Sequence, residues 1–553
     1  MKIPEEDLRK KKQYIESLRT ERLPWWNIWR QLANYYLPNR YVTLLSPLER
    51  TRLLVDNPYI LDGTGTNAAR TLASGMMNGI TSPSRPWFKL RLAGTNEEAS
   101  TPARKWLDEV ERRMMLIMSE SNFYNALAVM YLDLVVFGTA ALIIYEDAES
   151  VIRCYSPPLG EFYLGQSSRL QVNRFAREFC LKVGQLEEMF GEENLSETTL
   201  NKYKMGGARN NDDIEICHMI EPHYPGDKYG IASSFAYREC YWEKSAQDGT
   251  VLRVRGFNEF PVIAPRYELS GNDSYGASRA MDALGDVKQL QQETKAKGKS
   301  LDRMNDPPVI ADIALQHKPL SLLPRGITYV PNANGVGVKP IHTVQPPIQE
   351  LTLDLRDIQA RIRETFHNDL FRMISELDTV RSATEIDARK EEKLVLLGPV
   401  LERFETEALD PAINRIFSIM ERAKLLPEAP QEIAEQQLEI QYVSILSTAQ
   451  RAVGTVSVER WLQLIGGLAG LKPELVNIPD FDELIRGYGS DLGVPARYMH
   501  DKDRTGQLNE QYRQQLEAQQ AAETGTALVQ GAKTLSEADV GGGANALQTI
   551  LGG

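Results

Sequence analysis

Apolar residues recur at intervals of three and four along much of the chain, which is the pattern of helices with one buried face. The most regular run has its apolar positions at Leu351, Leu355, Ile358, Ile362, Phe366, Leu370 and Ile374. This run predicts a helix over 348–375, about 42 Å long at 1.5 Å per residue. Shorter runs predict helices over 5–22, from Pro24 to Pro38, over 64–80 and from Thr101 onwards.

A second long helix is predicted over 276–305, and it is unusually polar. Between Lys288 and Ser300 its only apolar side chains are Leu290 and Ala296. Such a helix either lies in solvent or faces a water-filled cavity. The residues between the two long helices, 306–347, are rich in proline and glycine and predict short strands and turns. The pattern therefore predicts a stalk of two helices that carries a small head.

The stretch that follows, 381–411, predicts a capped helix with a bend. Ser382 and, three residues later, Glu385 form a capping box, which marks a helix start. Seven of the nine residues in 385–393 are charged, and apolar positions at helical spacing follow them. Gly398-Pro399 lies in the middle of this pattern, and an internal proline removes a backbone hydrogen bond and kinks a helix. On pattern alone, this is an ordinary kinked helix in a large, helix-rich protein.

Residues 140–270 have a different texture. Short β-prone runs alternate with turns there, and Asp248-Gly249 is a strong hairpin signal between two of these runs. A further strand is predicted from Leu438, followed by more helices and by a Gln-rich helical tail from Asp501 that ends in glycines. The predicted fold class is α+β, mainly α.

One apolar segment, 126–145, has the length of a membrane span. Asp133 interrupts it, and a charge in the middle of a span costs several kcal/mol. Gly138-Thr139 also divides it into a helical half and a β-prone half. We therefore interpret the segment as a buried helix, a glycine turn and a buried strand.

Bulk properties limit the classes of function. A chain of 553 residues is too long for one hydrophobic core, so we expect more than one domain. The net charge of −12 argues against a conventional nucleic-acid binder, which carries a strongly basic domain, although it leaves room for contact with DNA that must move. The four cysteines form no C-x-x-C pair, which fits reduced thiols, and the N-terminus shows no signal peptide.

Motifs for chemistry are mostly lacking. Gly298-Lys299-Ser300 resembles the end of a phosphate-binding loop, but Glu293 stands where that motif needs glycine. The turn at Asp62-Gly63 lacks the strand and the third glycine of a dinucleotide fingerprint, and His218 and His223 fit no zinc spacing. We predict no catalytic, cofactor or metal residue. A structural or assembly protein is favoured over an enzyme such as a motor or nuclease, and a membrane-associated scaffold built on 126–145 is the other alternative.

Four blocks resemble the head-to-tail connector, or portal, proteins of short-tailed bacteriophages. They are ILDGTGTNAARTLASGMMNGITSPSRPWFKL (60–90), FYNALAVMYLDLVVFGTAALIIYED (123–147), RSATEIDARKEEKLVLLGPVLERFETEALDP (381–411) and EIQYVSILSTAQRA (439–452). They run in the family's order over nearly the whole chain. The third block is the most specific.

The resemblance implies a portal fold that assembles as a ring of twelve subunits around a DNA channel at one capsid vertex. It implies a wing over 1–275, stem helices over 276–305 and 348–375 with a clip over 306–347 between them, a channel loop over 376–384, a second part of the wing over 385–485 and a crown with a partly disordered tail over 486–553. The implied partners are double-stranded DNA, the major capsid and scaffolding proteins, the packaging motor (terminase large subunit) and a tail adaptor. The implied location is the virion, with assembly in the host cytoplasm.

Charge is consistent with a conduit. Twelve copies (12 × −12) would carry −144, so the assembly as a whole would repel DNA. A few cations could still make weak, sliding contacts, and the candidates are Lys295, Lys297, Lys299, Arg303 and Arg381. The alternative is that these side chains are solvated or pair with carboxylates of a neighbouring subunit. The helix cap of Ser382 and Glu385 would then fix the end of the channel loop, and Gly398-Pro399 would bend the helix from the channel into the wing.

Overall fold

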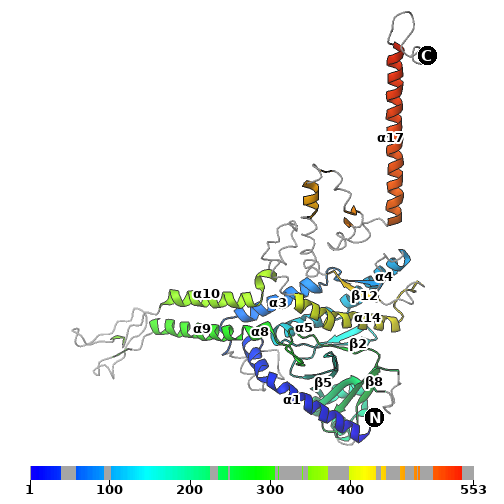
Figure 1. The fold of residues 1–553 in the computed structure, drawn as a ribbon. Coiled ribbons are helices and arrows are strands. Elements are labelled where there is room, and N and C mark those ends of the chain that lie inside the picture. The colour runs from blue at the N-terminus through cyan, green and yellow to red at the C-terminus, as the bar shows by residue number, and fades with distance from the viewer. Residues whose placement is uncertain are drawn as a thin grey trace, which may run out of the picture. The chain divides into compact units, whose positions relative to one another are not determined.

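The computed structural model describes residues 2–38, 58–92, 101–224, 234–246, 249–305, 309–310, 339–340, 347–371, 398–430, 438–443, 461–467, 472, 479–481, 484–485 and 502–537. The chain divides into two units, Met1–Gln450 and Arg451–Gly553. The first unit holds the helices and sheets shown in the lower part of Figure 1. In the second unit the main element is the 36-residue helix α17, Lys502–Glu537, where the sequence predicts a Gln-rich helical tail.

The N-terminal helix α1, Glu5–Tyr36, is continuous and contains Pro24. The sequence predicts two helices there, with the second one beginning at Pro24, and this prediction is wrong. The proline side chain is exposed, so its ring disturbs no packing. Buried residues on either side, Leu18 and Trp29 among them, hold both halves of the helix against the body and offset the lost backbone bond.

Three further helices build the main core together with the second half of α1. They are α3 (Thr64–Ile80), α4 (Thr101–Glu120) and α5 (Phe123–Phe137). Trp106, Val110, Met114 and Ile117 form the buried face of α4, as their spacing predicts. All four helices contribute to one apolar cluster.

The apolar segment 126–145 is a buried helix, a glycine turn and a buried strand, as predicted. Helix α5 ends at Phe137, Gly138 has a φ of 75°, and strand β2 covers Leu142–Asp147. Among the residues that the structure describes, no helix combines the length and the apolar character needed to cross a membrane.

Gly138 lies against Gly276, directly before the long polar helix. A Cβ atom on Gly138 would approach the carbonyl oxygen of Gly276 to 2.2 Å. Thr139 Oγ1 accepts a hydrogen bond from the Gly276 amide (2.8 Å), and Ser278 Oγ donates one to the Val136 carbonyl (2.8 Å). The polar helix therefore starts from a fixed point on the end of α5.

The β-rich region forms two antiparallel sheets. Strand order is β4-β5-β6-β7-β8 in the five-stranded sheet and β3-β2-β9 in the three-stranded one. A hairpin between the two runs that flank Asp248-Gly249 is confirmed, because β7 and β8 pair from Tyr237↔Phe257 to Tyr241↔Arg253. The strand bounds are β3 Val151–Tyr155, β4 Phe162–Gln166, β5 Val172–Lys182, β6 Asp213–Pro222, β7 Tyr237–Glu243, β8 Arg253–Phe257 and β9 Val262–Ile263.

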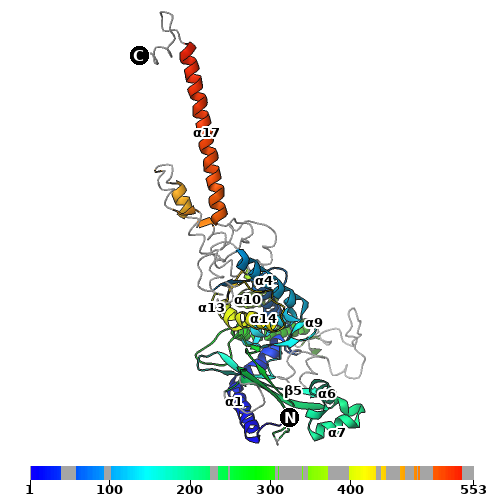
Figure 2. The ribbon, with the colours of Figure 1, turned by 90° about the vertical axis from the view of Figure 1, so that its right-hand side faces the viewer.

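Helices cover both faces of the five-stranded sheet. The first half of α1 packs on one face through Leu8, Ile15 and Leu18. Short helices between β5 and β6 pack against residues of the other face, and Figure 2 shows two of them, α6 and α7, beside β5. Their bounds are α6 Val183–Phe190, the 3-10 turn Glu192–Asn194, α7 Glu197–Met205 and the 3-10 turn Gly207–Asn211.

A third, two-stranded sheet joins distant parts of the chain. Strand β1, Phe88–Leu92, pairs antiparallel with β12, Leu438–Tyr442, which confirms the strand predicted from Leu438. Trp87, next to β1, stacks on the Tyr442 ring with centroids 6.5 Å apart. The pairing therefore joins two segments of the first unit that are about 350 residues apart in the chain.

The two long helices lie side by side and project from the body in Figure 1. After the short helix α8, Arg279–Asp282, the polar helix α9 covers Leu284–Asn305. Helix α10 covers Ile348–Thr365, and the chain turns at Phe366–His367, where His367 has a φ of 50°. The single helix expected over 348–375 is thus interrupted. The turn lets Phe366, Leu370 and Phe371 all enter the main core.

The last part of the first unit runs from α13, Gly398–Phe404, through a π-helical turn, Glu405–Leu409, into α14, Asp410–Arg422. Ala412, Ile413, Ile416, Ile419 and Met420 form the buried face of α14. A π-turn widens the helix by one residue and shifts the side chains that follow, and such turns often occur at functional sites.

Candidate functional site

The helix pair α9–α10 is antiparallel, and side-chain contacts join the two helices at two levels. Near the base, Arg361 Nη2 donates to Asp286 Oδ1 at 3.0 Å, and further out Lys297 Nζ donates to Thr352 Oγ1 at 2.9 Å. Further along the chain, the two-residue strands β10 (Val309–Ile310) and β11 (Lys339–Pro340) pair antiparallel, Val309 with Pro340 and Ile310 with Lys339.

Leu290, Leu355, Ile358 and Ile362 are among the buried residues of the helix pair, and most of the other side chains of α9 are polar. Lys295, Lys299 and Arg303 are exposed and follow one another at intervals of four, so each is turned by about 40° around α9 from the one before it. Lys297 differs from these three, because its ammonium group reaches Thr352 on the partner helix. Of the four candidate cations on α9, three are therefore exposed, and Lys297 is held in the contact between the two helices.

Gly298, Lys299 and Ser300 lie inside α9. A phosphate-binding loop needs an irregular turn in which successive backbone N–H groups point at the ligand, and a helix interior uses those groups for its own bonds. This placement agrees with the sequence argument against a nucleotide site.

A polar junction holds the base of the helix pair to α3. Gln291, which is 6% exposed, accepts hydrogen bonds on Oε1 from the amides of Leu61 (2.7 Å) and Asp62 (2.8 Å). Its Nε2 donates to the Asp62 carbonyl at 2.8 Å. The Asp62 side chain accepts from the Thr64 amide at the start of α3 (2.8 Å) and from Gln359 Nε2 of α10 (2.8 Å). Three helices thus meet at Asp62, which the sequence identifies only as a turn and helix cap.

Some of the predicted residues lie outside the part of the chain that is described. These are Arg381, Ser382 and Glu385, and with them the proposed channel loop 376–384. Gly398 and Pro399 are described and form the first residues of α13. The bend at Gly398-Pro399 stays a prediction, because the residues directly before it are not described.

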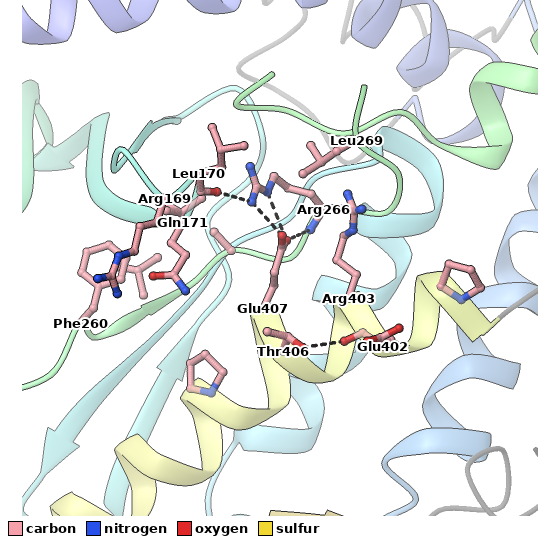
Figure 3. Close-up of a pocket in the computed structure, with 15 residues that line it drawn as sticks. Arg169, Leu170, Gln171, Phe260, Arg266, Leu269, Glu402, Arg403, Thr406 and Glu407 are labelled. Carbon is pink, nitrogen blue, oxygen red and sulfur yellow. Dashed lines mark hydrogen bonds and ion pairs between the residues drawn. The ribbon is translucent and has the colours of Figure 1, made fainter. Parts of the chain in front are cut away.

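A cleft of about 650 Å³ lies where the π-turn meets the β-rich region (Figure 3). Arg266, which is 3% exposed, points at Glu407 of the π-turn. Glu407 accepts hydrogen bonds from the Arg266 amide (3.0 Å), Nε (3.2 Å) and Nη2 (2.8 Å), and Nη2 also donates to the Leu170 carbonyl (3.0 Å). A bidentate pair of this kind fixes the orientation of both groups, so it holds the π-turn against the sheets.

A second ionic cluster binds α14 to the three-stranded sheet. Arg415, 1% exposed, donates to Glu259, and Arg422 bonds both Glu259 (2.8 Å) and Glu146 of β2 (2.7 Å). Burial would raise the pKa of Glu259, but the hydrogen bonds from Arg422 and Arg415 hold that pKa below its usual range. Nothing in the sequence marked Arg266, Glu407 or Arg415, because isolated charged residues in β-prone and helical runs carry no pattern.

His218 is a core histidine. It is fully buried in β6, stacks on Tyr241 with ring centroids 3.9 Å apart, and burial lowers its pKa to about 4. Arg177 Nε donates to its Nδ1 (3.0 Å), which assigns the proton to Nε2, and Nε2 lies 3.0 Å from a Glu239 oxygen. No group of three or more metal-binding side chains was found in the described ranges.

The fold is thus an α+β body from which an antiparallel helix pair projects, with buried polar junctions at its base. These features define a protein with a protruding two-helix stalk. The chain belongs to the family of bacteriophage head to tail connecting proteins, whose family model matches residues 9–500.

Two relatives agree with this family over nearly their whole length. The chain is 37% identical over 527 residues to the portal protein of Salmonella phage epsilon15, which covers 95% of this chain and 94% of that protein. It is 36% identical over 524 residues to the probable portal protein of Bordetella phage BPP-1, covering 94% and 93%. The resemblance to portal proteins of short-tailed phages is confirmed.

Proposed function

We propose that copies of this chain form a ring, twelve in number, at one vertex of a phage capsid, and that the genome is packaged and ejected through the ring as double-stranded DNA. The observation that carries the proposal is the projecting antiparallel helix pair α9–α10, which contacts at Asp286–Arg361 and at Lys297–Thr352 hold together. The family match over residues 9–500 supports it.

The proposed division of labour follows the elements of the fold. The body and its sheets, within 1–275 and 385–485, would form the wing, and α9 and α10 would form the stem within 276–305 and 348–375. Residues 306–347 would form the clip, where the packaging motor and later the tail adaptor dock. Residues 376–384 would form the channel loop, 486–553 the crown, and the capsid proteins would surround the wing.

We propose that α9 presents its outer face to the DNA. That face, opposite α10, carries the exposed neutral residues Gln289, Gln292 and Ala296, followed by Lys299 and Arg303 towards the tip. Few cations on a neutral polar surface give weak contacts, whereas a binder with many phosphate contacts would hold the DNA in place. Lys297 is the weakest candidate, because it bonds Thr352, and Arg381 remains a candidate outside the described residues.

Electron microscopy of the purified protein tests the central claim. We expect a particle of about twelve times 62.3 kDa with a central hole, and no ATPase activity from the protein alone. A chain that stays monomeric under all conditions would refute the proposal. In a packaging reaction, Lys299→Gln with Arg303→Gln should change the packaging rate more than the matched control Arg153→Gln with Lys204→Gln, since the proposal assigns only the first pair to the DNA-facing side.

A further inference from the structure

The projecting helix pair carries opposite charge on its two flanks. Successive residues of a helix rotate by about 100°, so each side chain can be placed relative to the contact between α9 and α10. On one side of that contact, Asp286 of α9 meets Arg361 of α10. On the other side, Gln291 of α9 and Gln359 of α10 both bond Asp62. The side of α9 with Asp286 and the side of α10 with Arg361 therefore form one flank of the helix pair. The sides with Gln291 and Gln359 form the other flank.

The flank on the side of Asp62 is basic. Its exposed residues beyond the Asp62 junction include Lys295 and Lys299 of α9 and Arg356 of α10. Asp302, near the tip, is the one carboxylate that the helical spacing places among them in the described part of α9 and α10. We call Lys295, Lys299 and Arg356 the basic flank.

The opposite flank is acidic. Glu350, Asp354 and Asp357 of α10 are exposed there, and half-buried Glu293 of α9 lies on the same side. Arg361 is the cation of this side; it is paired with Asp286 and also interacts electrostatically with Asp354 and Asp357. We call Glu350, Asp354 and Asp357 the acidic flank.

Within the residues that the structure describes, none of these six side chains has an ion-pair partner. Like charges at intervals of three and four on one helix face repel one another. On the acidic flank the single cation Arg361 is shared with Asp286, so three carboxylates still outnumber it. A surface of opposite charge would relieve both flanks, and each flank matches the other one in charge and in number.

We propose that the basic flank of one copy packs against the acidic flank of the next copy, so that the helix pairs stand side by side around the ring. This proposal rests on the proposed function and adds the interface that sets the order of the copies. Two different, complementary surfaces on one chain give a head-to-tail contact, which closes into a ring when the rotation between copies is right. Charge complementarity of this kind fixes register and rejects wrong pairings.

The arrangement also separates the roles of the cations. Lys295 and Arg356 lie towards the neighbouring copy, whereas Arg303 lies on the outer face of α9, away from α10. Lys299 stands between the two positions. Loss of Lys295 or Arg356 should therefore affect assembly, and loss of Arg303 should affect only the passage of DNA.

Charge reversal in the full-length chain tests the interface. One variant carries Lys295→Glu, Lys299→Glu and Arg356→Glu, and the other carries Glu350→Lys, Asp354→Lys and Asp357→Lys. Each variant has like charges on both flanks, so the concentration at which half of the chains assemble should rise by about tenfold or more. A third chain with all six substitutions has its flanks exchanged and should assemble as the wild type does. An equimolar mixture of the two single-flank variants should recover rings with alternating copies.

A control separates pairing from net charge. Arg9→Glu, Arg153→Glu and Lys204→Glu also change the net charge from −12 to −18, but these exposed residues lie away from the helix pair, and assembly should persist. Mass photometry measures the particles, and circular dichroism with thermal unfolding verifies that each variant is folded. Raising salt from 0.15 to 0.5 M, which shortens the Debye length from about 8 Å to about 4 Å, should weaken wild-type assembly.

The outcomes are distinct. Rings of a folded single-flank variant at wild-type concentrations would overturn the interface and leave the proposed function standing. The interface would also be overturned if the folded single-flank variants and the six-substitution chain all failed to assemble. In that case the charges would affect assembly, but exchanging the two flanks would not restore it, so the flanks would not pair with each other. A wild-type chain that forms no ring would remove the proposed function itself.

Discussion

The ion pair between Arg266 and Glu407 gives the sharpest test of the packing of the π-turn. The perturbation is Glu407→Gln, which keeps the shape of the side chain and removes its charge. Arg266 would lose its carboxylate partner while it stays 3% exposed. It would keep the Leu170 carbonyl at 3.0 Å and the Asp273 carbonyl at 3.4 Å, which satisfy part of the guanidinium.

Breaking a buried ion pair by removing one partner costs about 3–5 kcal/mol. Glu407 is 20% exposed and two carbonyls remain on Arg266, so the lower end of the range, about 3 kcal/mol, applies here. An unfolding entropy of about 2.1 cal/mol/K per residue gives about 0.9 kcal/mol/K for the 450 residues of the first unit. The expected fall in melting temperature is therefore about 3 °C.

Differential scanning calorimetry of the full-length protein measures this shift. Glu402→Gln is the matched control, because Glu402 is an exposed carboxylate of the same segment, and it should stay within about 0.5 kcal/mol of the wild type. The double variant Arg266→Met with Glu407→Gln should recover at least half of the loss, since no buried charge is left unpaired and the amide oxygen at position 407 can still accept from the backbone amide of residue 266. An unchanged melting temperature for Glu407→Gln would refute this account of the pair.

Two further predictions concern a glycine and a buried carboxyl. Gly138→Ala should destabilise the first unit by about 3 kcal/mol or more, because the new Cβ would lie 2.2 Å from the Gly276 carbonyl oxygen at a φ of 75°. The control Gly298→Ala, inside α9 with nothing within 4 Å of the new Cβ, should not lower the melting temperature in the same assay. Burial raises the pKa of Glu111 to about 7, although the Leu90 amide donates to its carboxylate at 2.7 Å, so the folded state holds a proton that the unfolded state releases near pH 4.5. The stabilisation from this group is complete below pH 4.5 and is lost as the pH rises through 7, and the loss reaches about 3 kcal/mol. Glu111→Gln should therefore lose less melting temperature than the wild type between pH 5 and pH 8. An equal loss in the two proteins would contradict the assignment to Glu111.

Local patterns predicted the elements well where one face of a helix is buried. The spacing in α4 and the division of 126–145 at Gly138 are both found in the structure, because burial of a regular apolar face dominates local conformation. Pro24 and the turn at Phe366–His367 show where this reasoning fails. In both places packing against distant residues outweighs the local preference, and a single sequence does not reveal those residues.

The polar contacts that organise the candidate site were not predictable. Asp62 has the pattern of a turn, and its second role as the meeting point of α3, α9 and α10 depends on Gln291 and Gln359, more than 200 residues away in the chain. The same holds for Arg266 and Glu407, which are 141 residues apart. A hydrogen bond or ion pair between such residues leaves no periodicity, so only their positions in space reveal it.

The amino-acid sequence alone determined the mainly helical α+β class, the two-helix stalk, the acidic character and the connector family, because apolar periodicity, net charge and family blocks are all properties of the chain itself. The tertiary structure decided which cations share a face. Lys297 contacts Thr352, while Lys295 and Lys299 stay exposed. Arg356, which belongs to α10, lies on the same basic flank as these two lysines of α9. The physical reason is that a flank is formed by two antiparallel helices, and its charge depends on the rotation and register of both, which their packing contacts set.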